Sequence, residues 1–448
     1  MERVPMNNSS VIEAKVQDGK LVYIFDKKQH AQTLLHNLIV MHDNDEGNLT
    51  DVVITSKENE QFYFHGPILA ALSKNLEENL LKRGVGSADS KNTKTVMEEN
   101  FSSEAVQCLW DYAYTSVVTL TPSNINEVKE LAEHYGIVRL MHECTELLDR
   151  ETLFGEGQGK EEVGFKDVPE IILDRLHNFH EKKVMCTAVI TDCLSSTRFP
   201  CHGAVIAAAC NEFFLELVFG DSNSIIDVDG YTLQSIGPFL RYLYTAKLMI
   251  DQETVLPLLG FAAKFNIPSI GNACCSWLKF TLTANNALAL MTIAQDLLNK
   301  EKNQSSGKES QDDVSFASAL ADLYQHARAF VLRNFFSVQE SVQYLGISLG
   351  ELIDLLADDD LGVHSEEDIV YAVMKWVCCS PETRASDLPD LLQAVRLEYI
   401  SPEFLEAMLH HDLMITNSRC IQIIEDAQTI VLPSRPRRRS TVQRYDVG

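Results

Sequence analysis

One pattern of apolar and polar positions occurs twice along the chain. Tyr112-Ala113-Tyr114-Thr115 returns as Tyr242-Leu243-Tyr244-Thr245, an offset of 130 residues from Tyr114 to Tyr244. Because ungapped agreement over this distance is hard to obtain by chance, the pattern predicts an internal duplication. The same offset joins further pairs: Ala132 and Ala262, Ile137 and Ile267, Cys144 and Cys274, and Leu148 and Leu278.

Each copy begins with strand signals and continues with helices. Short β-branched runs at 51–55 and 188–191 are followed by turns and by second runs at 62–65 and 199–202, which predicts a hairpin in each copy. Later in each copy, apolar residues at i, i+4, i+7 and i+8 form one helical stripe. The sequence therefore predicts two tandem α+β domains. The two stripes are Leu140, Cys144, Leu147 and Leu148, and Ile270, Cys274, Trp277 and Leu278.

Strand signals stop after Thr283, and only helical patterns follow. The run Ser365-Glu366-Glu367-Asp368 is typical of a capping box at a helix start. Ser401 and Pro402 indicate another start, with serine as the N-cap and proline in the first turn. These patterns predict an all-helical third domain, so the fold class is α+β and helix-rich. The first of these helical faces consists of Leu349, Leu352, Ile353 and Leu356.

Polar, glycine- and serine-containing stretches separate the predicted domains. Three of them, 83–95, 154–168 and 299–314, are interpreted as exposed loops or linkers. From the N-terminus, the chain is predicted to contain an N-terminal segment 1–27, a first α+β domain 28–150, a linker 151–168, a second α+β domain 169–283, a helical domain 284–433 with a polar insert 299–314, and a basic tail 434–448.

Charge and cysteine content narrow the classes of protein. The formal net charge is −26, from 38 lysines and arginines against 64 acidic residues, and such a surface repels nucleic acid and anionic membranes. No stretch approaches the about 18 apolar residues of a membrane span. The 11 cysteines are an odd number without CxxC spacing, as in a reducing compartment. We expect a cytoplasmic protein, alone or with a nuclear pool.

No catalytic, cofactor or metal motif is found, so the sequence predicts a non-enzyme. The glycine-rich stretch 155–160 lacks the residues of a phosphate-binding loop, since Phe154 and Glu161 occupy two required positions. Asp51, His65 and His202 are interpreted as hydrogen-bonded structural residues beside strands. No cysteine or histidine grouping has zinc-ligand spacing.

Several of these residues resemble known domain families. The first copy is similar to the core of a BTB (POZ) domain, and the second copy matches with Thr187 in the place of Asp51. Residues 370–376 and 395–405 are similar to a BACK domain, the helical part of kelch-like proteins. The resemblance is to a kelch-like protein with two tandem BTB domains and, since the chain stops at Gly448, without a kelch propeller. The BTB-like residues are Asp51, Val52, Ile54, Phe64, His65 and 69–73.

This resemblance implies a non-enzymatic scaffold that serves as an adaptor of a cullin-3 RING ubiquitin ligase. Carried over by position, the cullin-binding face would include Phe214, Phe219 and Tyr244 in the second copy and Tyr114 in the first. Family members that bind cullin carry a hydrophobic-x-Glu motif, whereas this chain has Phe219-Gly220-Asp221 there. The alternatives are a cullin-independent scaffold (a cytoskeletal organiser or a protein that sequesters other BTB proteins) and a transcriptional co-repressor platform.

BTB domains of this kind self-associate through a helix-lined face. We expect the two copies to cover each other in an intrachain pseudo-dimer, or one copy to form an ordinary homodimer; the client protein stays open. In the tail, Ser440 next to Arg437–Arg439 is a candidate phosphorylation site, with a solvated end, a localisation signal and docking to the acidic body as alternatives. The candidate BTB–BTB interface residues are Leu34, Leu35, Leu38, Leu176 and Phe179.

Overall fold

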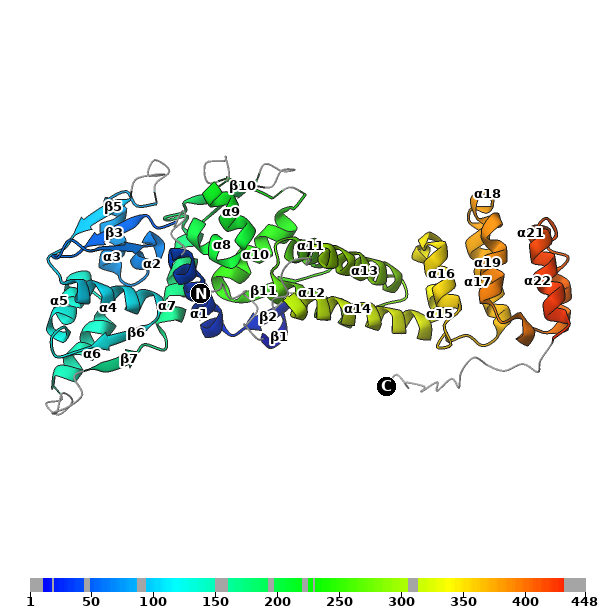
Figure 1. The fold of residues 1–448 in the computed structure, drawn as a ribbon, viewed down its shortest axis with the longest axis horizontal. Coiled ribbons are helices and arrows are strands. Elements are labelled where there is room, and N and C mark those ends of the chain that lie inside the picture. Colours follow the sequence, from blue (N-terminus) through cyan, green and yellow to red (C-terminus); the bar gives the residue numbers. More distant parts are fainter. Residues whose placement is uncertain are drawn as a thin grey trace. The chain divides into compact units, whose positions relative to one another are not determined.

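The computed structural model describes residues 11–17, 20–43, 49–86, 94–149, 160–191, 197–219, 225–228, 230–304 and 313–430. The chain forms two compact units, Met1–Cys274 and Cys275–Gly448. The first predicted α+β copy and residues 169–274 of the second lie in the first unit, and the helices of the predicted third domain lie in the second (Figure 1).

The first copy is built on a three-stranded sheet. Strand β3 (Val52–Thr55) lies between antiparallel β4 (Gln61–Phe64) and parallel β5 (Thr95–Glu98). The β-branched Val52, Val53 and Ile54 are buried, as the apolar run predicts. Six further elements complete the copy: α2 (Gly66–Ala70), α3 (Lys74–Lys82), α4 (Ser103–Tyr114), β6 (Val117–Leu120), α5 (Ile125–Tyr135) and α6 (Val138–Asp149).

The second copy repeats this order of elements. Strand β8 (Ala188–Thr191) lies between antiparallel β9 (Arg198–Cys201) and parallel β10 (Ile225–Asp227). The predicted α+β fold class is confirmed, and the two sheets have the same topology. The other elements are α8 (Gly203–Ala209), α9 (Asn211–Phe219), α10 (Leu233–Thr245), β11 (Lys247–Ile250), α11 (Val255–Lys264) and α12 (Pro268–Phe280).

Each copy is preceded by a strand and a helix that pack against the other copy. Strand β1 (Val11–Gln17) pairs with β2 (Lys20–Phe25), which precedes α1 (Lys27–Asp43) and pairs with β11 of the second copy. Strand β7 (Glu161–Gly164), which precedes α7 (Val168–Glu181), pairs with β6 of the first copy. The predicted N-terminal segment and the predicted linker thus contain strands. The polar linker gave no strand signal, because the edge that stabilises β7 belongs to a distant part of the chain, whereas the apolar run 21–25 of the N-terminal segment was not interpreted as a strand.

The described residues of the second unit are helical. Ser365 caps α17 in the predicted capping box. Its side chain accepts a hydrogen bond from the backbone N–H of Asp368, and the Asp368 carboxylate accepts one from the backbone N–H of Ser365. Ser401 precedes α20 without making a side-chain cap bond. The predicted insert is shorter than 299–314, because α13 continues to Gln304 and α14 begins at Asp313. The main helices are α13 (Ala287–Gln304), α14 (Asp313–Arg333), α15 (Phe335–Val338), α16 (Leu349–Leu356), α17 (Glu366–Cys378), α18 (Pro381–Arg384), α19 (Leu388–Ala394), α20 (Pro402–Met408), α21 (Asp412–Ile415) and α22 (Ser418–Gln428).

One aromatic side chain in the core of this unit, Trp376, has a polar edge that is hydrogen-bonded. Trp376 is buried, and its Nε1–H donates to the carbonyl of Ile347 at 3.1 Å. The Arg384 guanidinium lies 4.0 Å from the centre of the Trp376 ring and also donates to the carbonyl of Leu345. These bonds fix α17 against the neighbouring turns.

Among the described helices, none is long and apolar enough to cross a bilayer.

Candidate functional site

A buried tyrosine and histidine join the first hairpin to helix α4. The backbone N–H of His65 donates to the Tyr114 hydroxyl at 2.9 Å, and the His65 Nδ1 lies 2.9 Å from the same oxygen. Tyr114 is 4% exposed and His65 is 1% exposed. Their bonding satisfies polar groups at the end of strand β4, which is a structural role.

The second copy contains the same pair. The backbone N–H of His202 donates to the Tyr244 hydroxyl at 3.1 Å, and Nδ1 lies 2.9 Å from that oxygen. The His202 Nε2 lies 3.0 Å from the carbonyl of Val184, so a neutral ring with its proton on Nε2 satisfies every bond. Burial lowers the pKa of His202 to about 4, which keeps this neutral form at physiological pH.

Asp51 and Thr187 perform one task in the two copies. The Asp51 carboxylate accepts from the backbone N–H of Gly66 at 2.5 Å, and the Thr187 hydroxyl accepts from that of Gly203 at 3.0 Å. The departure at Thr187 therefore keeps the helix start bonded without a charge. Burial raises the pKa of Asp51 to about 6, against the lowering effect of its backbone bonds. A Cβ on Gly66 would lie 2.5 Å from Val85 Cγ1, so glycine is required there.

The structure corrects the predicted cullin-binding face. Tyr114 and Tyr244 lie in the core, with exposed fractions of 4% and 1%, so the prediction that their side chains form an outer contact surface is wrong. The physical reason is their hydroxyl bonding to buried histidines. Phe214 on α9 is half-buried, and the side chain of Phe219 lies outside the described residues. Leu215 lies beside it in the chain, is 45% exposed and was not predicted from the sequence as a contact residue.

The lead helices of the two copies pack across the junction between them. Helix α1 contacts α8 of the second copy, α7 contacts the equivalent helix α2 of the first, and α1 and α7 contact each other. Figure 1 shows these two helices side by side between the copies. The structure thus places all five predicted interface residues on exchanged helices, and Leu34, Leu35, Leu38, Leu176 and Phe179 are at most 2% exposed.

Buried polar bonds cross the same junction. The His30 Nε2 on α1 lies 2.9 Å from the carbonyl of Leu243, and the Asn37 Nδ2 donates to the carbonyl of Ala208 at 2.9 Å. Burial lowers the pKa of His30 to about 4. Arg175 on α7 forms a 2.7 Å ion pair with Glu77 on α3. Since these groups are directional, they fix the register of the exchanged helices.

The exchanged strands are anchored by equivalent phenylalanines. Phe25 is the last residue of β2 and packs against Tyr242 with ring centres 5.0 Å apart, and Phe165 follows β7 and packs against Tyr112 at 4.8 Å. Their backbone N–H groups donate to carbonyls beside the last strand of the opposite copy. Neither phenylalanine was predicted from the sequence as an interface residue. The run 21–25 was the available signal, because it is apolar and rich in β-branched and aromatic residues.

The described residues were compared with the requirements of a metal site and of a reactive thiol. No group of three or more His, Cys, Asp or Glu side chains there could hold a metal ion. The ten described cysteines are free thiols, and burial raises the pKa of Cys201, Cys210 and Cys420, which makes thiolate formation harder. Ser440 and the basic tail lie outside the described residues.

The fold class is thus a tandem pair of topologically equal α+β modules with buried exchanged helices, followed by a helical array. The BTB/POZ domain family matches residues 41–152 and again residues 176–282, and the family described as BTB And C-terminal Kelch (BACK) matches residues 313–410. The chain belongs to the BTB-BACK proteins of the kelch-like family.

Relatives include Kelch-like protein 24 from Rattus norvegicus and from Homo sapiens, and Kelch-like protein 24a from Danio rerio. Each is 27% identical over 264 residues, which is 58% of this chain and 40% of the relative. The chain thus matches well under half of the length of these curated relatives. Among solved structures, the BTB domain of human gigaxonin aligns with 26% of this chain and 95% of that domain at 20% identity, with a TM-score of 0.23.

Proposed function

We propose that this chain is a non-enzymatic adaptor-like subunit of a cullin-3 RING ubiquitin ligase. The BTB and BACK matches support this proposal, because kelch-like proteins that contain BTB and BACK domains generally act as such adaptors.

One observation carries the proposal furthest: the two copies exchange their lead helices and strands within a single chain. Helices α1 and α7 bury the apolar stripes that a lone BTB domain would offer to a second chain. An intrachain partner avoids the entropy cost of bringing two chains together. The second copy then remains available to a different protein, and its helix α9 presents the exposed Leu215 beside Phe214.

The internal pseudo-dimer predicts a monomer in solution. Multi-angle light scattering at micromolar concentration is expected to give the mass of one 50.3 kDa chain. The physical reason is that the self-association faces are already covered. A stable two-chain species would contradict the pseudo-dimer and support an ordinary homodimer through one copy.

Cullin binding is expected to depend on the second copy. Leu215→Glu is expected to weaken binding to the purified cullin-3 N-terminal domain at least tenfold in calorimetry, because a charge would replace an exposed apolar contact. Leu81→Glu is the matched control, since Leu81 is 42% exposed on the equivalent helix α3 of the first copy. This control is expected to bind as the unmodified chain does, with one cullin per chain.

A cullin-independent scaffold is the second candidate. The sequence favours it at one position, where Phe219-Gly220-Asp221 replaces the hydrophobic-x-Glu motif of cullin-binding relatives. If the unmodified chain fails to bind the cullin domain at tens of micromolar, the ligase proposal is wrong. The intact BTB pair would then act as an interaction platform without a ligase.

A further inference from the structure

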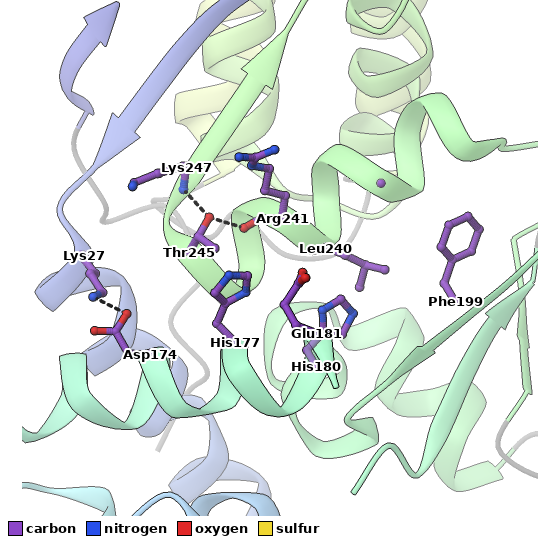
Figure 2. A pocket seen from close by; sticks show the side chains of 11 residues that line it. Lys27, Asp174, His177, His180, Glu181, Phe199, Leu240, Arg241, Thr245 and Lys247 are labelled. Atoms are coloured by element: carbon purple, nitrogen blue, oxygen red, sulfur yellow. Dashed lines mark hydrogen bonds and ion pairs between the residues drawn. The ribbon is translucent and has the colours of Figure 1, made fainter. Parts of the chain in front are cut away.

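A pocket of about 670 Å³ lies beside helix α7 at the start of α1. Its walls come from α7, α10, β9 and β11 of the second copy, and Lys27 is supplied by the lead helix of the first. Figure 2 shows Lys27 joined to Asp174 at one end, with His177 and His180 projecting from α7. The volume falls within the roughly 300–1,000 Å³ of typical ligand pockets.

The pocket carries positive charge on a strongly acidic protein. Lys27, Arg241 and Lys247 line it, whereas the whole chain has a formal charge of −26. Lys27 is engaged by Asp174 at 2.6 Å, and Glu181 is the other carboxylate in the wall. Arg241 and Lys247 are exposed and form no ion pair with any other described residue. These two cations are therefore available to a ligand.

The pocket also contains an unsatisfied polar atom and an apolar wall. The Nδ1 of His177 is buried and has no hydrogen-bond partner among the described residues. The His180 ring stacks on Tyr244 at 4.3 Å, and burial lowers the pKa of His180, so this ring lines the wall in its neutral form. Phe199 and Leu240 supply apolar surface. A ligand with both an anionic group and an apolar group would match this lining.

The equivalent position in the first copy lacks these features. With the offset of 130 residues, Arg241 corresponds to Asp111 and Lys247 to Val117. Asp111 accepts a 2.8 Å bond from Gln107, and Trp110 replaces Leu240 with its ring centre 4.9 Å from that of Tyr114. The cations of Arg241 and Lys247 are therefore found in the second copy and not at the equivalent positions of the first. Duplication within one chain permits this divergence, whereas a homodimer would have two identical sites.

We propose that this pocket binds an acidic peptide segment of a partner protein. Arg241 and Lys247 bind its carboxylates, His177 supplies a further polar contact, and an apolar side chain packs on Phe199 and Leu240. A peptide fits the lining better than a small anion does, because an inorganic anion leaves the apolar wall in contact with water. Leu215 of α9 is not among the residues that line the pocket, so this binding does not use the proposed cullin contact.

The experiment uses the full chain and a fluorescein-labelled hexapeptide of alternating glutamate and leucine. Fluorescence anisotropy is expected to show saturable binding that weakens as salt is raised. The double variant Arg241→Asp, Lys247→Val is expected to lose at least tenfold in affinity. It carries the residue types found at the equivalent positions of the first copy, so the fold accepts them. Circular dichroism and the unfolding midpoint verify that the variant is folded.

Matched controls separate the pocket from general charge effects. Lys74→Asp with Lys82→Val on α3 changes the net charge equally and is expected to leave the affinity unchanged. A peptide with lysine in place of glutamate is expected not to bind. Equal affinity for the Arg241→Asp, Lys247→Val variant overturns the proposal. Displacement of the peptide by inorganic phosphate at the same concentration as the peptide also overturns the proposal, because it indicates a simple anion site.

Discussion

Leu38→Ala is expected to lower the free energy of unfolding by about 2–5 kcal/mol, the usual cost of removing a buried leucine side chain. Leu38 lies in α1 and is 0% exposed, and that helix packs against α7 and α8 of the other copy. The truncation leaves a cavity at the junction that holds the two copies together. Urea unfolding followed by circular dichroism measures the loss.

The control for this prediction lies on the same helix. Gln32→Ala changes an exposed position of α1 and is expected to alter the unfolding free energy by less than about 0.5 kcal/mol. If Leu38→Ala costs no more than Gln32→Ala, the junction does not stabilise the protein. The exchange of lead helices would then be unable to support the internal pseudo-dimer.

Acidification is expected to destabilise the first unit through its buried histidines. Burial lowers the pKa of His30 and of His202 from 6.5 to about 4. Between these values the unfolded chain binds protons that the folded chain excludes, so stability is fully present above pH 6.5 and is lost as the pH falls toward 4. Each histidine contributes about 3 kcal/mol over this window. Asp51 opposes them, because its raised pKa of about 6 makes the folded chain take up a proton.

The variant His202→Gln isolates one of these contributions. At pH 8 it reports the cost of lost packing and of the lost bond to Tyr244. The difference in unfolding free energy between the unmodified chain and the variant is expected to shrink by up to about 3 kcal/mol between pH 6.5 and 4. Denaturant titrations at several pH values provide the curve. A difference that stays constant across this range would show that His202 titrates alike in folded and unfolded chains.

Much of the architecture could be predicted because local patterns matched local structure. The paired Tyr-x-Tyr-Thr motifs, the β-branched runs and the capping box at Ser365 each depend on neighbours within a few residues. The sequence shows that Thr187 stands in the second copy where Asp51 stands in the first. It does not show that the hydrogen bond to the helix start is kept. Only the geometry shows that both side chains accept from a helix-start glycine.

The predicted site residues form two groups. One group was predicted from the local spacing of a helix, and the other depends on partners that are distant in the chain. Leu34, Leu35 and Leu38 were identified because their spacing forms a helical stripe, and the structure places them in the interior. Tyr114 and Tyr244 were placed on an outer face by positional analogy. Their hydroxyls instead meet histidines 49 and 42 residues away in the chain, and such distances carry no periodic signal.

The duplicated pattern of the chain by itself determined two α+β modules, a helical third part and the absence of any recognisable catalytic motif. It did not determine with which copy the strands β2 and β7, which precede the two copies, form a sheet. That choice was made by the tertiary structure, because strand β7 in a polar stretch gains its partner only on the edge of β6, and β2 only on β11. Edge pairing satisfies backbone groups regardless of side-chain character, so residue patterns hold no record of it.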